Sequence, residues 1–375
     1  MLDLTKIRLE IDEIDAQIVE LYEKRMQVCK EVAAFKIAND KPVFDKEREA
    51  QKIAKVKELA KEVDNKQGIE ELFEQLMSMS RKMQYKLIEQ ANINKNDIFE
   101  VVDQITTQNK KVVYQGDRGA YSHLATIQYF GEDVEAYKVD TFRGALEEVR
   151  DGKASFAILP LENSTAGMVE GIFDLLIEFD LYIIGEQIIP INHCLLGVEG
   201  SKKEEIKTIY SHPQSLMQTM NYLKKMNIEQ IGMENNAYAA KKVANDGLTS
   251  QAAIASSLAA SEYGLKILEK DIQDLKGNST KFIIVSKQKI CKNDANTISI
   301  CFELPDERGS LYHILAHFIY NGLNLSKIES LPINNQNWGY RFFVNFEGNF
   351  RDSAVKNVLH GIKDEARNVK VLGNF

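Results

Sequence analysis

Residues 277–285 read Gly-Asn-Ser-Thr-Lys-Phe-Ile-Ile-Val, and the largest part of the chain is organised around this stretch. The apolar run from Phe282 to Val285 is rich in β-branched side chains and predicts a buried strand. The Gly-Asn pair that precedes it favours a turn. We therefore expect Ser279 and Thr280 to stand at the mouth of a buried strand with their hydroxyl groups free.

Four further segments are rich in hydroxyl and amide side chains, and each lies at the end of a predicted strand. Taken alone, residues 277–282 could simply be a loop closed by short polar residues. The other segments favour a site instead, because they need a common meeting point that contains few ionisable groups. They are Gly-Ala-Tyr-Ser-His at 119–123, Pro-Leu-Glu-Asn-Ser-Thr-Ala-Gly at 160–167, Asn-His-Cys at 192–194 and Tyr-Ser-His-Pro-Gln at 210–214.

Strand and helix patterns alternate through the middle of the chain, which predicts parallel sheets with right-handed crossovers. A long apolar run at 181–198 divides the pattern in two, and the chain returns through 280–287. Two lobes with a doubled connection predict a cleft between them, with ligands at the carboxyl ends of strands. We expect such ends at Gly116, Pro160, Ser211 and Ser256. A solute-binding module would share this layout. The predicted strands cover 111–115, 134–139, 156–161, 207–211, 228–233, 251–255 and 280–287, and the predicted helices cover 121–129, 141–150, 168–178, 214–226 and 237–246.

The first helix pattern covers residues 5–36 and carries one apolar stripe with a cation in it. Arg25 occupies a stripe position, and a buried cation is costly unless an anion meets it. Lys36 falls about 20° from Arg25 around the helix, so both point into one space. Arg8 lies on another face, so a second copy of the chain could supply it. The apolar positions are Ile7, Ile11, Ile14, Ile18, Leu21, Val28, Val32 and Phe35.

Two more helices follow a break at Lys41-Pro42. The second begins near Asp45, with Asp45, Arg48 and Glu49 on one face. The third covers 68–89, and Ser80 interrupts its apolar seam with Gln84 one turn further along the same side. A dimerising coiled-coil hairpin, with one polar residue setting its register, is the simpler interpretation. Two interruptions together with convergent charges favour a polar pocket inside a helical bundle.

The last 79 residues, 297–375, show a strand-helix-strand-strand-helix-strand order that is typical of ferredoxin-like domains. The predicted elements are strands at 297–304, 324–332, 340–346 and 369–372 and helices at 310–321 and 353–366.

Length and composition limit the possible functions. A chain of 375 residues predicts two or three domains. The net charge of −8 argues against nucleic acid or an anionic membrane as the main partner. The amino terminus lacks signal-peptide features, and no apolar run approaches a membrane span. The four cysteines and six histidines show no metal-ligand spacing, so we expect reduced thiols, no metal and a cytoplasmic location.

The helical opening, residues 1–90, resembles the all-helical class of chorismate mutase. The resemblance implies a rearrangement of chorismate to prephenate that needs no acid, base or cofactor. It also implies that Arg25, Arg48 and a partner chain's Arg8 serve the substrate carboxylates or the structure around them. Lys36 and Gln84 would donate to the ether oxygen, and Glu49 would accept from the ring hydroxyl. The polar positions that match are Arg8, Arg25, Lys36, Asp45, Arg48, Glu49, Ser80 and Gln84.

The middle segments, taken together and in order, resemble prephenate dehydratase. The resemblance implies that prephenate loses its ring hydroxyl and one carboxylate together, and that Thr280 donates to the departing hydroxyl. Lys281 stands where the family usually has arginine, which replaces a bidentate clamp by a point charge. We expect His193 and His212 to be structural. The residues implied to orient the substrate are Ser122, Asn163, Ser164, Thr165, Ser211, Gln214 and Lys281.

Gly309-Ser310-Leu311 and the later Ile-Glu-Ser-Leu-Pro at 328–332 resemble motifs of the ACT regulatory domain. The resemblance implies that phenylalanine binds as an effector near Gly309, Ser310, Leu311, Glu329 and Ser330. Leu331 replaces an arginine of the family motif. A dimerisation domain without a ligand is the alternative.

Taken together, these resemblances imply a bifunctional enzyme of phenylalanine biosynthesis that forms a homodimer or a higher homo-oligomer. Its fold would join an all-α mutase domain, a two-lobed α/β dehydratase domain like a periplasmic binding protein, and an α+β ferredoxin-like domain. The alternatives are a monofunctional dehydratase with a helical dimerisation region and a non-enzymatic two-lobed amino-acid sensor. The expected boundaries are 1–90 for the mutase, 91–110 for a linker, 111–288 for the dehydratase and 297–375 for the regulatory domain.

Overall fold

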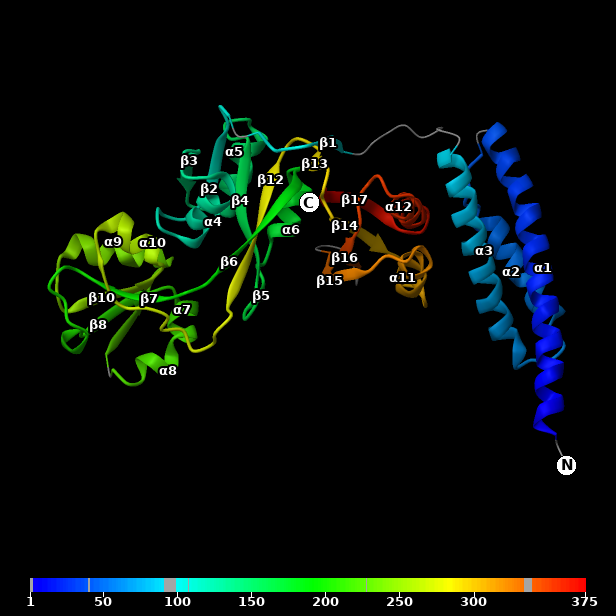
Figure 1. Cartoon of the computed structure of the whole chain (residues 1–375), viewed down its shortest axis with the longest axis horizontal. Coiled ribbons are helices and arrows are strands. Elements are labelled where there is room, and N and C mark those ends of the chain that lie inside the picture. The colour runs from blue at the N-terminus through cyan, green and yellow to red at the C-terminus, as the bar shows by residue number, and fades with distance from the viewer. Residues whose placement is uncertain (1–2, 40, 91–98, 107, 227, 334–338) are drawn as a thin grey trace. The chain divides into compact units, whose positions relative to one another are not determined.

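The computed structural model describes residues 3–39, 41–90, 99–106, 108–226, 228–333 and 339–375 (Figure 1). The chain divides into two compact units. The first unit contains Met1–Ile98 with Ile300–Lys370, and the second contains Phe99–Ser299 with Val371–Phe375. Within the described residues, no helix has both the length and the apolar character that crossing a membrane requires.

Three helices open the first unit: α1 (Leu4–Ala38), α2 (Lys46–Leu59) and α3 (Asn65–Gln90). The break between α1 and α2 falls at the expected Lys41-Pro42. The carboxylate of Asp45 caps α2 by accepting a hydrogen bond from the Arg48 backbone N–H at 3.0 Å. Asp45 is therefore the N-cap residue of α2, which begins one residue later at Lys46, close to the predicted start.

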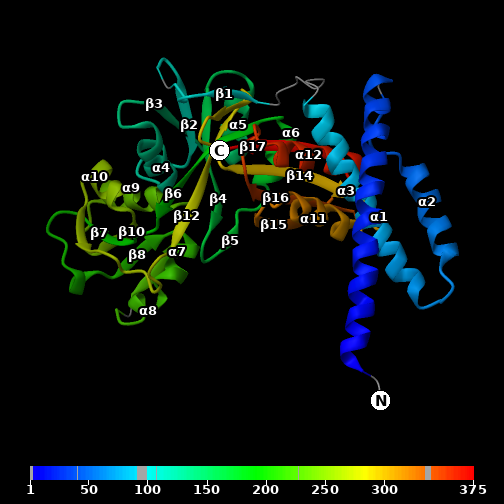
Figure 2. The same cartoon turned by 45° about the vertical axis from the view of Figure 1, so that its right-hand side comes forward.

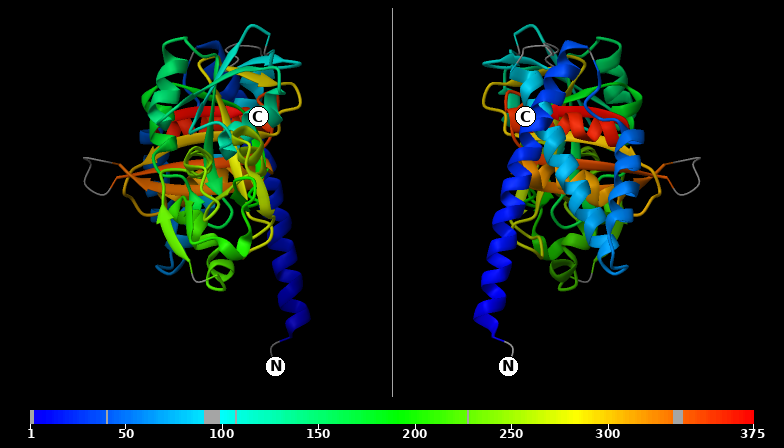
Figure 3. Two further views of the ribbon diagram at one scale, coloured as in Figure 1. Left: turned by 90° about the vertical axis from the view of Figure 1, so that its left-hand side faces the viewer. Right: turned by 90° about the vertical axis from the view of Figure 1, so that its right-hand side faces the viewer.

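The apolar stripe of α1 is not covered within one chain. Among the described residues of α1 only Ala33 is buried, whereas Ile14 is 55% and Leu21 is 65% exposed. The amino-terminal part of α1 also projects beyond α2 and α3 (Figure 3). A row of large apolar side chains in water is unfavourable, so this face needs a partner.

The carboxyl-terminal segment contains two helices and four strands in the expected β-α-β-β-α-β order. The strands lie side by side as β15-β16-β14-β17. Buried aromatic side chains, among them Phe302, Phe318 and Phe346, form its core. The elements are β14 (Thr297–Leu304), α11 (Ser310–Asn321), β15 (Leu325–Pro332), β16 (Tyr340–Glu347), α12 (Ser353–Glu365) and β17 (Arg367–Asn374).

Each lobe of the second unit contains one main sheet (Figure 2). The first has the order β6-β12-β4-β2-β3, and the second has the order β11-β7-β10-β8-β9. The strands are β2 (Lys111–Gln115), β3 (Glu135–Val139), β4 (Phe156–Asn163), β6 (Tyr182–Pro190) and β12 (Ser279–Ser286) in the first, and β7 (Cys194–Gly197), β8 (Thr208–Ser211), β9 (Glu229–Gly232), β10 (Gln251–Ala255) and β11 (Lys266–Glu269) in the second.

The prediction of parallel sheets is only partly right. Strands β2, β3 and β4 are parallel to one another, and so are β8, β9 and β10. Strand β12 instead runs antiparallel to both β4 and β6, and β7 runs antiparallel to β10 and β11. The reason is the doubled connection: the chain leaves the first lobe along β6 and returns along β12, so these neighbours run in opposite directions.

Seven helices flank these strands in the described part of the second unit. Thr141 caps α5, because its Oγ1 accepts from the Gly144 N–H at 2.9 Å. The predicted helix at 214–226 is two short helices, since the Thr219 hydroxyl bonds back to the Ser215 carbonyl at 2.8 Å and bends the chain. The helices are α4 (Tyr121–Phe130), α5 (Phe142–Arg150), α6 (Ile172–Glu178), α7 (Pro213–Gln218), α8 (Met220–Leu223), α9 (Asn236–Asp246) and α10 (Ser257–Tyr263).

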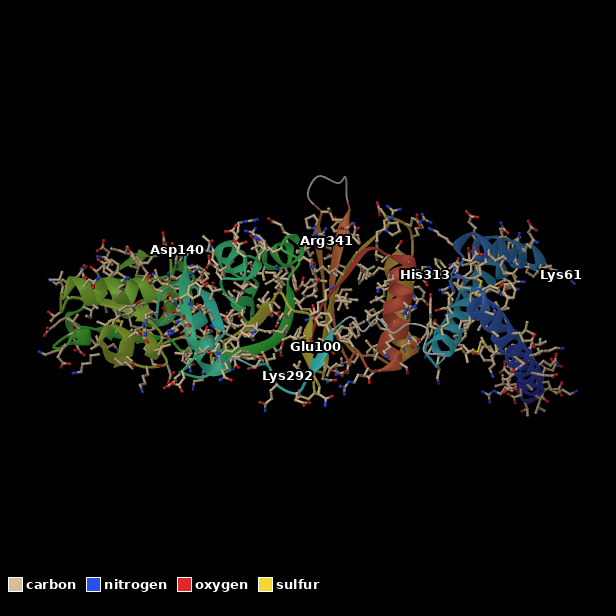
Figure 4. All side chains as sticks on the ribbon, turned by 90° about the horizontal axis from the view of Figure 1, so that it is seen from above. Lys61, Glu100, Asp140, Lys292, His313 and Arg341 are labelled. Atoms are coloured by element: carbon tan, nitrogen blue, oxygen red, sulfur yellow. The ribbon has the colours of Figure 1, made fainter. Side chains whose placement is uncertain are left out.

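Three other local predictions differ from the structure. Residues 100–102 lie in the predicted linker but form strand β1 (Glu100–Val102), which pairs with β13 (Ile290–Lys292); Glu100 and Lys292 mark these strands in Figure 4. Residues 91–98 and 107 of that linker lie outside the described residues. The predicted helix at 168–178 begins only at Ile172, because β5 (Gly167–Met168) pairs with β4. Pro160 lies inside β4 and not at its end.

Candidate functional sites

A cleft of about 480 Å³ lies between the two lobes of the second unit. Four of the predicted dehydratase residues line it: Ser122, Asn163, Gln214 and Thr280. They come from α4, β4, α7 and β12, so the topology brings distant segments to one place. The other lining residues are Gln115, Ala120, Tyr121, Phe142, Pro160, Val169, Ile191, His193, His212, Ser215, Gln218, Glu234, Asn235, Asn236 and Phe282.

Strand β12 positions Thr280 beside an ordered amide. Thr280 stands opposite Asn163 of β4, and its side chain is almost buried. Asn163 Nδ2 lies 3.0 Å from Thr280 Oγ1 and 2.8 Å from Asn278 Oδ1. Asn278 is itself buried and was not among the predicted site residues. Its position in the predicted turn directly before β12 could have identified Asn278 as a site residue.

The remaining predicted residues of this group lie around the cleft without lining it. Ser211 is fully buried, and its hydroxyl donates to the Ile254 carbonyl at 2.7 Å. Ser164 Oγ accepts from the Ser279 N–H at 3.0 Å, and Thr165 Oγ1 accepts from Gln218 at 3.1 Å. These three residues therefore organise the walls of the cleft.

Lys281 is not brought to the cleft. Its ammonium pairs with the Glu186 carboxylate at 3.0 Å. Successive side chains of a strand point to opposite faces, so Lys281 points away from the face that carries Thr280. The position where the family usually has arginine is thus part of an ion pair on the other side of β12.

Two histidines of the cleft have different surroundings. His212 Nδ1 accepts from the Gln214 N–H and caps α7. His193 is only 1% exposed and lies 3.0 Å from Gln218 Oε1 and 3.2 Å from the Tyr121 hydroxyl. Burial lowers the pKa of both histidines, so both imidazoles are neutral at neutral pH. Sequence reasoning missed the Tyr121–His193–Gln218 cluster, although Tyr121 and His193 belong to segments that it singled out and Gln218 lies in the predicted helix at 214–226.

The cleft is lined almost entirely by uncharged groups. Among the described lining residues there is no lysine or arginine, and Glu234 is the one carboxylate. Helix α4 begins at the cleft, and its N-cap residue Ala120 offers no side-chain cap. First-turn N–H groups without a side-chain cap favour negative charge. The cleft can therefore orient an anion by hydrogen bonds, and the residues present offer hydroxyl and amide donors.

The helical segment brings part of its predicted polar set together. Arg25 Nη1 donates to Ser80 Oγ at 2.6 Å and to the Leu76 carbonyl at 3.0 Å. Ser80 and Gln84 are buried on the same side of α3, and Gln84 Oε1 has no partner among the described atoms. Arg8 and Arg48 are exposed. The guanidinium of Arg25 is thus held in place before any ligand is bound.

Lys36 and Glu49 form a second polar group in the same segment. Burial lowers the pKa of Lys36, although the nearby carboxylates of Asp45 and Glu49 oppose this effect. Lys36 Nζ donates to the Val43 carbonyl at 2.5 Å. Glu49 pairs with Arg81, a residue that sequence reasoning missed although it adjoins Ser80.

The predicted effector residues lie on two elements of the carboxyl-terminal segment. Gly309 is the N-cap of α11 with φ +81°, and Ser310 Oγ donates to the Glu307 carbonyl at 2.9 Å. Leu311 and Glu329 are half-buried, whereas Ser330 is exposed. Leu331 stands opposite Arg341 of β16, which pairs with Glu303 at 2.6 Å.

The described residues contain no group of three His, Cys, Asp or Glu side chains that could hold a metal ion.

Two family models match the chain. One described as prephenate dehydratase matches residues 112–290, and one described as chorismate mutase type II matches residues 7–85. A bifunctional chorismate mutase/prephenate dehydratase of Stutzerimonas stutzeri is 33% identical over 379 residues, which cover 99% of this chain and 97% of that protein.

Two solved structures are similar over 70% of this chain. GqqA, described as a novel type of quorum quenching acylase, has a TM-score of 0.65 and 29% identity, with 97% of that chain covered. The prephenate dehydratase of Arthrobacter aurescens in complex with L-Phe has a TM-score of 0.63 and 28% identity, with 89% of that chain covered.

Proposed function

Because the chain belongs to the bifunctional chorismate mutase/prephenate dehydratases, we propose that its two reactions use two separate sets of residues. The enzyme converts chorismate to prephenate and prephenate to phenylpyruvate. The mutase set lies in α1–α3, and the dehydratase set lies around the cleft of the second unit. Incubating the purified chain with chorismate and following prephenate and phenylpyruvate tests both steps.

The assignment of the dehydratase site rests on one observation: the Thr280 hydroxyl lines a cleft whose described lining residues include no lysine or arginine. The electron pair of the breaking C–C bond enters the ring, the C–O bond breaks, and carbon dioxide and water leave. Thr280 would donate a hydrogen bond to the departing hydroxyl, while the net proton comes from solvent. Ser122, Asn163 and Gln214 lie within the same cleft and support this assignment. Ser164, Thr165 and Ser211 would order its walls, and Lys281 would act only through its ion pair.

The mutase site would be built from the ordered Arg25 and the group around Lys36. Rearrangement is unimolecular, so the enzyme has to hold a compact dianion and stabilise the ether oxygen as the C–O bond breaks. Arg25 would bind a carboxylate, bidentate where geometry permits. Lys36 and Gln84 would donate to the ether oxygen, and Glu49 would accept from the ring hydroxyl. Asp45, Arg48 and Ser80 would support these groups, and the net reaction requires no cofactor.

A second chain would complete the mutase site. The uncovered apolar stripe of α1 supports a homodimer or a higher homo-oligomer, because two such stripes can bury each other. Arg8 is exposed on a face of its own helix and would reach the partner's site. A cytoplasmic location stays a prediction from the spacing of the four cysteines in the sequence.

A mixture of two inactive variants is expected to regain mutase activity. Arg8→Ala and Arg25→Ala chains each lack one half of every site when pure. A heterodimer would contain one site with both defects and one intact site. About half of the dimers in an equimolar mixture would be heterodimers, so we expect recovery of roughly a quarter of the wild-type sites. Mutase assays before and after mixing measure this recovery. Activity that stays at the level of the pure variants would mean that each site is built from one chain.

The carboxyl-terminal segment would be a ferredoxin-like ACT domain that binds phenylalanine. The strand order β15-β16-β14-β17 with two helices supports this fold assignment. The N–H groups at the start of α11 would bind the effector carboxylate, since Gly309 leaves room for a close approach. Glu329 and Ser330 of β15 would contribute from the neighbouring strand. Arg341 stands beside Leu331 and keeps a cation at the strand end despite the leucine.

Phenylalanine is expected to bind and to inhibit dehydration. Inhibition requires that the effector prefers one conformation of the enzyme. Calorimetry with L-phenylalanine, beside dehydratase assays at the same concentrations, measures both effects. A Gly309→Ala variant should bind more weakly, because its φ of +81° disfavours a side chain. Heat without inhibition would separate binding from regulation, and the absence of both would leave only a dimerisation role.

A further inference from the structure

We infer that Asn163 orients the Thr280 hydroxyl by a hydrogen bond and does not contact the substrate directly. Asn278 in turn holds the Asn163 amide in the position that this hydrogen bond requires. The Asn163 amide donates to Thr280 Oγ1, which leaves the threonine hydrogen to donate into the cleft. Asn163 and Asn278 are then positioning residues for the dehydratase reaction. The inference rests on the proposed role of Thr280, and its test is chosen so that the two can fail separately.

Backbone donors determine which way the Asn163 amide points. The N–H groups of Thr165 and Ala166 each lie 3.0 Å from Asn163 Oδ1. A backbone N–H can only donate, so the atom that it meets must be the amide oxygen. The NH₂ group of Asn163 therefore faces the other side, where Asn278 and Thr280 lie.

The Asn163 NH₂ group has two hydrogens and three acceptors within reach. The distances are 2.8 Å to Asn278 Oδ1, 3.0 Å to Thr280 Oγ1 and 3.1 Å to the Ser279 carbonyl. The shortest of these contacts is to Asn278. Asn278 is 5% exposed, and its backbone carbonyl accepts from the Ile191 N–H at 2.9 Å. Asn278 thus holds one amide hydrogen and leaves the other for the neighbouring acceptors, which include Thr280.

The direction of the Thr280 hydrogen follows from this arrangement. A hydroxyl group has one hydrogen and can accept and donate at once. Among the described residues, Asn163 is the side chain bonded to Thr280 Oγ1, and no acceptor for the threonine hydrogen lies within hydrogen-bond distance. Thr280 lines the cleft, so its hydrogen is available to a substrate hydroxyl there. A hydroxyl that accepts a hydrogen bond also becomes a better donor, because the two bonds polarise each other.

Replacing Asn163 by aspartate reverses the direction of this hydrogen bond. A carboxylate at 163 accepts from Thr280 and draws its hydrogen away from the cleft. We expect kcat for prephenate dehydration to fall by about 100-fold at neutral pH, with KM changed by less than about threefold. A protonated carboxyl can donate again, so part of the lost kcat should return as the pH is lowered through the pKa of that group. Loss of kcat with rescue at low pH, while the thermal unfolding temperature of the variant stays that of wild type at neutral pH, is a signature that a merely structural role would not produce.

Asn278 provides an independent pair of variants. Asn278→Asp keeps the acceptor oxygen for the Asn163 amide, so we expect it to retain kcat within about threefold of wild type. Asn278→Ala removes that oxygen, and we expect kcat to fall by about tenfold. Asn221→Asp, the same change at an exposed position of α8, is the matched control and should leave dehydration unchanged. Because Asn163 and Asn278 lie in the second compact unit, circular dichroism and thermal unfolding of each full-length variant report whether that unit has folded.

Three outcomes would overturn the inference. One is an Asn163→Asp variant with normal kcat, and another is a raised KM with kcat unchanged, which would mean that Asn163 contacts the substrate. The third is a loss that does not respond to pH. If Asn163→Asp does not fold, equal activities of Asn278→Ala and Asn278→Asp would overturn it. Full dehydratase activity in Thr280→Val would instead overturn the proposed function of Thr280, which is a separate result.

Discussion

Replacing Arg25 by alanine is expected to lower kcat/KM for the rearrangement of chorismate by about 10³-fold, while dehydration of prephenate changes by less than about twofold. The Arg25 guanidinium is fixed by Ser80 Oγ at 2.6 Å and by the Leu76 carbonyl at 3.0 Å. A fixed cation meets a substrate carboxylate without further ordering, so its loss removes both charge and orientation. The dehydratase residues lie in the other compact unit, which is why their reaction should continue.

Lys24→Ala is the matched control for this experiment. It removes a cation from the neighbouring position of α1, where the side chain is exposed, and it should leave mutase activity nearly unchanged. Assays of both reactions on each full-length variant, beside circular dichroism, measure the outcome. A parallel loss of both activities in Arg25→Ala with the helices intact would mean that the two sites are not independent.

Periodicity was enough to predict the helices of the first unit. A stripe of apolar residues at helical spacing and a Lys-Pro break determine α1 and the start of α2 within a few residues. The carboxyl-terminal elements were equally regular, and α11 begins and ends at the predicted Ser310 and Asn321. Local signals suffice where each element follows its own pattern.

The orientation of strands in the second unit could not be predicted from alternation alone. Alternation of strands and helices favours parallel pairing, but β6 and β12 connect the lobes in opposite directions and meet as antiparallel neighbours. That pairing joins residues almost 100 positions apart, and no local pattern encodes it. The cluster of Tyr121, His193 and Gln218 was missed for the same reason.

The position of Lys281 could have been predicted. Thr280 and Lys281 are adjacent in a strand, and adjacent strand residues point to opposite faces. If Thr280 points into the cleft, Lys281 must point away from it. The ion pair with Glu186 is consistent with this rule. The family motif placed both residues in one site, whereas the geometry of a strand separates them.

Replacing Thr280 by valine is expected to lower kcat for prephenate dehydration by about 10²–10³-fold and to leave the mutase reaction unchanged. Valine keeps the shape of threonine but has no hydroxyl group, so packing in the almost buried position is preserved. Among the described lining residues there is no lysine or arginine, and burial keeps His193 and His212 neutral, so these side chains offer no cationic donor to replace the hydrogen bond from Thr280 to the leaving hydroxyl.

The Thr280→Ser variant distinguishes the contribution of the hydroxyl group to catalysis from that of the methyl group. Serine keeps a donor but can rotate more freely, because threonine is stiffer about χ1. We therefore expect Thr280→Ser to retain between about a tenth and a half of the wild-type kcat, well above the valine variant. Steady-state assays with prephenate on the three proteins give the order threonine, serine, valine if the hydroxyl is the donor. Equal activity of the serine and valine variants would mean that the methyl group matters more than the hydroxyl, and that another group assists the departure of the ring hydroxyl.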